Sequence, residues 1–487
     1  MSEHSSNDGS RSPDGPPSDV PAHDAASSTV TNSGPALVRT MGLGALIIYG
    51  VGDMLGSGVY ALIGKAAGIM GNAVWLAFAT SMVAALLTGL SYASLGSRYP
   101  RAAGASFITQ RAFGIPFLSY MVGLAVAASG LTSFATQSRT FAGYLQGLLE
   151  GATSASKETP VLFVLGFIAV LTLINFWGMR ESTWLNMICT TIEVLGLVIV
   201  IIVGARYIGG VNYLEVPSTT PTDGGSNVAG ALTMGLLLQG AVLTFYSFIG
   251  FEDMINVSEE VKNPQRNFPI GVMVALGITT VIYIAISLTA VSVVPHAQLA
   301  ASKQPLVDVV KTAAPAFPSV LFSFIALFAI ANTGLLNYIM GSRLLYGMAR
   351  QGFVPKFLGE VHPQRRTPHY AIVVLMAVVI ALALVGDITK LALATSALLL
   401  TVFIVVNAAL LVLQRRPGEA KGQFEVPSIV PIGGVLVCSA MLISTLFDND
   451  RRAALAIAAA LLAIIAVLYA IMRPKNINEE TLAEAAE

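Results

Sequence analysis

Long apolar stretches recur along most of the chain, and short polar segments separate them. A helix rises about 1.5 Å per residue, so about 20 apolar residues cross the roughly 30 Å hydrocarbon core of a bilayer. We expect twelve such spans, at residues 42–71, 73–96, 115–147, 160–178, 184–209, 231–260, 268–294, 318–349, 369–386, 389–413, 427–447 and 452–472. The pattern predicts an all-α polytopic membrane protein.

The first span contains features that a simple membrane helix does not need. Residues 42–71 include Asp53 and a central Gly56-Ser57-Gly58 sequence. Breaking a helix in hydrocarbon exposes backbone groups that each cost several kcal/mol unless protein or water satisfies them. We therefore expect an interruption that serves a binding site. A half-helix ending at Leu55 offers free carbonyl groups and one beginning at Val59 offers free N–H groups, which suits the ammonium and carboxylate of a small zwitterion.

The sixth span repeats this anomaly. Phe245, Tyr246 and Phe248 surround Gly250, and the carboxyl group of Glu252 follows within the same apolar stretch. Matching interruptions in spans one and six, which would run in opposite directions, are the signature of two inverted five-helix repeats with a site near the membrane midplane.

Composition narrows the function classes. The chain has 487 residues, 55% of them hydrophobic and 11% charged, and its mean hydropathy is +0.73. A formal net charge of zero and the absence of a basic run argue against a nucleic-acid partner. Cys189 and Cys438 lie inside apolar spans, and all five histidines fall in the tail or in loops, so we expect no disulfide framework and no metal site.

The polar ends and the basic residues predict the organisation of the chain. Residues 1–40 are rich in Ser, Pro, Asp and Gly and are predicted to form a disordered cytoplasmic tail, and residues 474–487 a second cytoplasmic tail. Residues 41–413 would form a ten-helix transport core, and residues 414–473 two further helices. Most Lys and Arg residues fall on the side of the N-terminus, which predicts cytoplasmic termini for a protein of the cell membrane.

Four motifs resemble those of one transporter superfamily. They are Gly56-Ser57-Gly58, Tyr99-Pro100-Arg101 with Gly104 and Ser106, Gly250-Phe251-Glu252 followed by residues 259–270, and residues 342–355. Together they are similar to the amino acid–polyamine–organocation (APC) superfamily, and especially to bacterial amino acid permeases of the cationic amino acid transporter-like branch, over about residues 38–473. The resemblance implies the five-plus-five inverted-repeat (LeuT-like) fold, with discontinuous helices 1 and 6 and two extra C-terminal helices, and alternating access for amino acids.

The resemblance also implies a substrate site. It places the substrate carboxylate on the N–H groups of Ser57 and Gly58, the ammonium on the carbonyls of Met54 and Ile249, and Tyr246 as an aromatic gate. The full predicted substrate-binding set is Met54, Gly56, Ser57, Gly58, Tyr246, Phe248, Ile249 and Gly250. The competing interpretation is close helix packing by the small residues and ordinary core roles for the aromatic residues.

Two acidic residues are predicted to lie near mid-bilayer. Asp53 is about 18 Å into the first span and Glu193 about 15 Å into the fifth. A buried carboxylate is costly, so we hypothesise that Glu193, helped by Asp53, gains and loses a proton during transport. Proton-coupled relatives often have a lysine at this position, so Glu193 departs from the usual pattern. One alternative is that these carboxyl groups only hold helices together by hydrogen bonds. The other is that they attract a cationic substrate.

Four further residues are candidates for coupling or gating. Glu252 is predicted either to gate the site or to cap the inner half of span six. Asn332 and Thr333, together with Asn337, would either complete a cation site facing span one or simply join helices by hydrogen bonds.

These observations predict a secondary active amino acid transporter, with proton-coupled symport as the main hypothesis and sodium as the other possible coupling ion. A cationic amino acid or polyamine exchanger and a membrane substrate sensor are the alternatives. An enzyme is not expected, because no convergent catalytic or metal-binding set falls in the spans, and no GxxxxGK[ST] nucleotide loop is present. No cofactor is expected, and the predicted partners are an amino acid and the lipid bilayer.

Overall fold

The computed structural model describes residues 41–100, 104–150, 160–177, 183–217, 231–350, 354–363, 365, 367–447 and 451–472. Helices dominate these residues, and nine stretches among them are long and apolar enough to cross a membrane. The apolar helices Val161–Trp177 and His369–Val385 are shorter. The chain is therefore a multi-pass membrane protein. The predictions of disordered tails fall on residues 1–40 and 474–487, outside the described residues.

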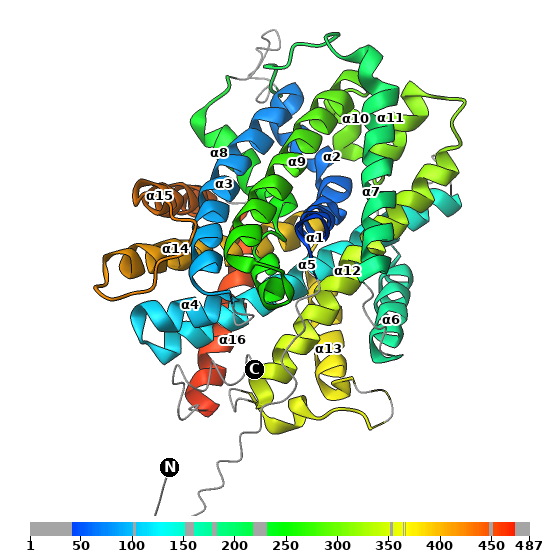
Figure 1. The fold of residues 1–487 in the computed structure, drawn as a ribbon. Coiled ribbons are helices and arrows are strands. Elements are labelled where there is room, and N and C mark those ends of the chain that lie inside the picture. The colour runs from blue at the N-terminus through cyan, green and yellow to red at the C-terminus, as the bar shows by residue number, and fades with distance from the viewer. Residues whose placement is uncertain are drawn as a thin grey trace, which may run out of the picture. The chain divides into compact units, whose positions relative to one another are not determined.

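Helices lie in each of the twelve predicted apolar ranges (Figure 1). The main helices are α1 (Leu43–Leu55), α2 (Ser57–Met70), α3 (Val74–Arg98), α5 (Pro116–Glu150), α6 (Val161–Trp177), α7 (Thr183–Gly204), α8 (Met234–Phe245), α9 (Pro264–Val293), α12 (Ser319–Arg350), α13 (His369–Val385), α14 (Ile388–Arg415), α15 (Ile429–Ser444) and α16 (Arg452–Met472). Three shorter helices were not predicted, namely α4 (Gly104–Phe113), α10 (His296–Ala301) and α11 (Pro305–Ala313). They lie in connections and lack the long apolar run on which the prediction depended.

The helices pack into two groups. In one, α3 lies beside α8 and α9, and α1 packs on α9 (Figure 1). In the other, α5, α6, α12 and α13 share a separate hydrophobic cluster. Its centre is aromatic: Phe134 stacks on Tyr338 at a ring distance of 4.9 Å, and the Tyr338 hydroxyl donates to the Ile372 carbonyl at 2.7 Å. We call the first group the bundle and the second the scaffold.

The predicted interruption of the first span is present at a single residue. Gly56 has φ −46° and ψ −138°, which ends α1 and lets α2 begin at Ser57. A Cβ atom on Gly56 would lie 1.9 Å from the Thr333 Oγ1 atom of α12, so only glycine fits where the break presses against the scaffold.

The sixth span is interrupted over a longer stretch. α8 ends at Phe245, a 3₁₀ turn covers Tyr246–Phe248, and Ile249 is extended. Gly250 has φ +127°, a left-handed conformation that favours glycine. The chain then continues as a 3₁₀ helix, Asp253–Glu260, whereas the sequence pattern predicted an apolar span as far as residue 260.

The two interruptions touch each other. A Cβ atom on Gly250 would lie 2.9 Å from the Asp53 carbonyl carbon, and one on Gly58 would lie 2.7 Å from the Ser247 Cα atom. Glycine at these positions allows the two backbones to approach closely.

A short backbone pairing also joins the beginning of α1 to the segment after the second interruption. The Met41 N–H donates to the Glu260 carbonyl at 2.9 Å, and the Lys262 N–H donates to the Met41 carbonyl at 2.8 Å. Met41 and Val261 form the isolated parallel bridge that results.

Candidate substrate site

A cavity lies where the two helix breaks meet the scaffold. About 300 Å³ of space without protein atoms, open solvent included, lies among its lining residues. Its lining comes from both breaks and from α5 and α12, and consists of Asp53, Met54, Ser57, Gly58, Ser133, Gln137, Tyr246, Ile249, Gly250, Asp253, Thr333 and Asn337. Nine of these residues belong to the predicted site set.

One end of the cavity is the N-terminus of α2. Ser57 and Gly58 form its first turn, where backbone N–H groups have no acceptor within the helix. No side chain caps this turn and no acidic residue lies in it. The helix dipole adds partial positive charge there, so this end of the cavity suits a carboxylate.

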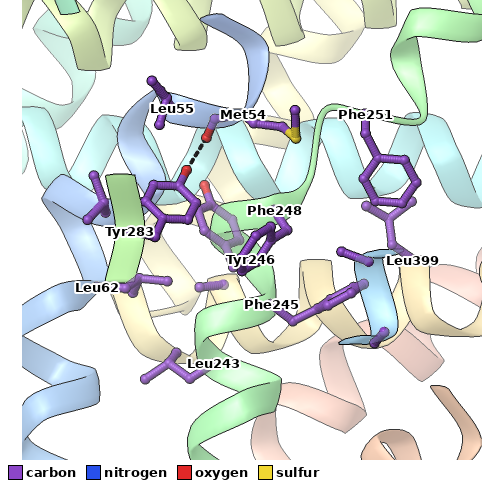
Figure 2. Packing of buried hydrophobic residues seen from close by; sticks show 14 of the residues in the cluster. Met54, Leu55, Leu62, Leu243, Phe245, Tyr246, Phe248, Phe251, Tyr283 and Leu399 are labelled. Atoms are coloured by element: carbon purple, nitrogen blue, oxygen red, sulfur yellow. Dashed lines mark hydrogen bonds between the residues drawn. The ribbon is translucent and has the colours of Figure 1, made fainter. Parts of the chain in front are cut away.

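The other polar end is formed by backbone carbonyl groups. Met54 is the second-last residue of α1, where carbonyls lack intrahelical partners. The Met54 carbonyl accepts a hydrogen bond from the Tyr283 hydroxyl of α9, as Figure 2 shows. Ile249 also lines the cavity, and its extended backbone leaves the helical ladder. This end of the cavity suits a cation.

Tyr246 connects the second break to the scaffold. Its hydroxyl lies 3.0 Å from the Ser133 Oγ atom of α5, and the Gln137 Nε2 atom donates to that same Oγ atom at 3.2 Å. The Tyr246 ring is buried beside Phe245 and Phe248 (Figure 2). The ring in this place covers one side of the cavity.

Three residues of the predicted set lie next to the cavity without lining it. Phe248 is fully buried and packs edge-on against Tyr283, with ring centroids 5.2 Å apart. Gly56 faces Thr333, as described above. The Glu252 carboxylate accepts a hydrogen bond from the Gly250 N–H at 2.9 Å, so it caps the strained turn of the second break.

Glu193 and Asn332 lie apart from the cavity lining. Glu193 is fully buried in α7, and within the described part of the chain both its carboxyl oxygens lack a hydrogen-bond partner. Thr190, one turn earlier, packs against α1, because a Cβ atom on Gly52 would lie 2.0 Å from its Oγ1 atom. The Asn332 amide nitrogen is likewise without a partner among the described residues.

Several residues of the site were missed by the sequence analysis. Ser133 and Gln137 on α5, and Thr333 and Asn337 on α12, are pairs spaced four residues apart, and of these only Thr333 and Asn337 were predicted. Polar residues at this spacing share one face of a helix, and a polar face in an apolar span is the sequence signal that could have identified these residues. Asp253 and Tyr283 were missed as well.

Comparison with known proteins decides the family. The sequence profile of the amino acid permease family matches residues 41–473. The chain belongs to the amino acid permease family. This result confirms the resemblance to the APC superfamily, whose members are transporters rather than enzymes.

Relatives of the permease carry different substrate names. It is 26% identical to the branched-chain amino acid permease BcaP of Bacillus subtilis, over 84% of this chain and 88% of that protein. It is 31% identical to the chloroplastic cationic amino acid transporter 9 of Arabidopsis thaliana, over 68% of this chain but only 59% of the plant protein. It is 28% identical to the methylthioribose transporter of B. subtilis, over 83% of this chain and 87% of that protein.

Proposed function

We propose that the permease carries an amino acid across the cell membrane by alternating access. In this proposal twelve spans, ten of them in two inverted five-helix repeats, surround the site, and both termini are cytoplasmic. The observation that carries the proposal is the meeting of two helix breaks at one polar cavity. The first break offers N–H groups at Ser57 and Gly58 and a carbonyl group at Met54, and the second break offers a carbonyl group at Ile249. Together they provide the polarity that an α-amino acid requires.

The substrate would lie across the two breaks. Its carboxylate would accept hydrogen bonds from the N–H groups of Ser57 and Gly58, and its ammonium would donate to the carbonyls of Met54 and Ile249. Its side chain would then extend toward Gln137 and Asn337 on the scaffold. The scaffold would therefore select among amino acids while the two breaks hold the part that all of them share.

Proton coupling through Glu193 is the second part of the proposal. An ionised carboxylate that is fully buried without a partner is costly, so a bound proton stabilises it. Because Thr190 on the same helix packs on α1 just before its break, a change of charge at Glu193 acts close to the substrate site. Protonation and substrate binding are thereby linked.

Uptake into proteoliposomes tests the function directly. Purified permease should accumulate a labelled amino acid when the outside is acidic, and the same amino acid should raise its melting temperature. A panel of amino acids, amines and methylthioribose identifies the substrate. If no amino acid stabilises the protein or enters the vesicles, the proposal is wrong, and if a sodium gradient rather than a pH gradient drives uptake, its coupling part is wrong.

A cationic substrate is the second candidate, and one observation favours it. Asp53 and Asp253 both line the cavity, whereas its lining contains no Lys, Arg or His. An anionic lining attracts a cationic side chain or a diamine. Competition by arginine, lysine and putrescine against labelled alanine separates the candidates, since only an anionic site prefers the cations.

A further inference from the structure

Tyr283 is a fully buried residue of α9 that lies behind the substrate cavity and does not line it. Its ring is held between Phe78 and Phe248, at centroid distances of 5.5 and 5.2 Å. Figure 2 shows the ring between the two breaks, with its hydroxyl directed at the Met54 carbonyl. Aromatic packing on two sides fixes the position of this hydroxyl.

The hydroxyl contacts one carbonyl from each break. It is within hydrogen-bond distance of the Met54 carbonyl at the end of α1, and it lies 2.7 Å from the Ser247 carbonyl in the 3₁₀ turn after α8. A tyrosine hydroxyl has only one proton. It can therefore make a full hydrogen bond to one of these carbonyls at a time.

The two carbonyls differ in their access to the cavity. Met54 lines it, whereas Ser247 does not. A donor that enters the cavity can reach the Met54 side only, and the Ser247 carbonyl stays available to Tyr283. When the site is occupied, the ammonium and the hydroxyl can therefore satisfy both carbonyls, whereas in the empty site the hydroxyl can satisfy only one of them.

We propose that Tyr283 is a positioning residue for the substrate ammonium. In the empty site its proton is directed to the Met54 carbonyl and holds the end of α1 in place. When the ammonium of the substrate donates to Met54, the hydroxyl turns its proton to Ser247 and ties the second break to the occupied site. This inference rests on the proposed function, because it needs an amino acid in the cavity.

The test is the Tyr283→Phe variant, which keeps the ring and removes the hydroxyl. We measure inhibition of labelled uptake, or thermal stabilisation, by the best substrate and by its desamino carboxylic acid, which lacks the ammonium. The variant should bind the amino acid about tenfold more weakly while its affinity for the desamino acid is unchanged. The ratio of the two affinities therefore falls, and because both are measured on one sample, a lower yield of folded protein does not alter it.

Tyr338→Phe is the matched control. Tyr338 is also fully buried and also donates to a backbone carbonyl at 2.7 Å, but it lies within the scaffold. Its loss should leave the ratio unchanged. An unchanged ratio in Tyr283→Phe would overturn the inference while leaving the transport proposal intact, whereas a wild-type protein that binds no amino acid would overturn the transport proposal itself.

Discussion

Glycines at the two breaks set the distance between the backbones that form the cavity. Gly250 has a positive φ and lies in close contact with the Asp53 backbone, so both its backbone conformation and the lack of space for a side chain favour glycine at this position. Gly277 in the middle of α9 has no atom within 4 Å of a Cβ position, so it has neither constraint.

Gly250→Ala should therefore abolish substrate binding. The new methyl group meets the Asp53 backbone at about 2.9 Å, and the strained backbone costs about 1–3 kcal/mol. The measurement is substrate-induced thermal stabilisation together with uptake. Gly277→Ala is the control, and it should keep both because alanine favours a helix interior.

Glu193→Gln should separate transport from proton coupling. The amide has the size of the carboxyl group but cannot exchange a proton, so a pH gradient should no longer drive accumulation of the amino acid. Exchange of internal for external substrate should continue. Glu360→Gln, at an exposed position, is the control. Retained pH-driven accumulation in Glu193→Gln would show that the proton binds elsewhere.

The sequence was sufficient to predict where the backbone is interrupted and which residues surround the breaks, because glycine clusters and carboxyl groups are rare in apolar spans. It was not sufficient to predict which way each side chain points. Phe248 and Tyr246 are both aromatic residues of the second break, yet only Tyr246 lines the cavity. Tyr283 was missed since its helix, α9, has no strongly polar face and therefore gives no directional signal.

The connector between α14 and α15, residues 416–428, is held to α3 and α4 by ionic contacts. Arg98 pairs with Glu425, with an Nη2 to Oε2 distance of 2.5 Å. Arg111 pairs with Glu419 at 2.9 Å, and the Tyr99 hydroxyl donates to the same carboxylate. The connector thereby fixes the ends of two earlier elements.

Glu419 makes this attachment dependent on pH. Burial raises the pKa of Glu419, but hydrogen bonds from Tyr99 and Arg111 and the positive charges of Arg111 and Arg416 outweigh burial and hold that pKa below its usual value. Burial and the bond to Glu419 raise the pKa of Tyr99 to about 12, so Tyr99 remains a donor. The carboxylate therefore stabilises the fold above its unfolded pKa, and this stabilisation is lost as pH falls through the lowered folded pKa.

Glu419→Gln should lower the melting temperature at pH 7. The difference from wild type should begin to narrow below about pH 4.5, where the unfolded carboxyl group binds its proton. Thermal scans from pH 7 to pH 4 measure it. Asp387→Asn, in an exposed pair with Lys390, is the control and should change little. A pH-independent difference between Glu419→Gln and wild type would contradict this account.

Polar contacts join the bundle to the scaffold at the cavity. Tyr246 from the second break and Ser133 from α5 make one of these, at 3.0 Å. If the two groups move relative to each other during transport, such contacts have to break and form again.

A double-mutant cycle measures this contact. Tyr246→Phe and Ser133→Ala each remove one partner, and together they should show a coupling of about 0.5–1.5 kcal/mol in substrate affinity. Ser138→Ala is the control, because its hydroxyl donates to the Phe134 carbonyl of its own helix and has no other partner among the described residues. Additivity of Tyr246→Phe with Ser133→Ala would show that the contact does not help to close the site.

The backbone pairing of Met41 with residues 260–262 has a mechanical consequence. It joins the chain just before α1 to the segment after the second break, so the two segments are mechanically coupled. We therefore expect the beginning of α1 and residues 260–262 to be displaced as one unit during transport.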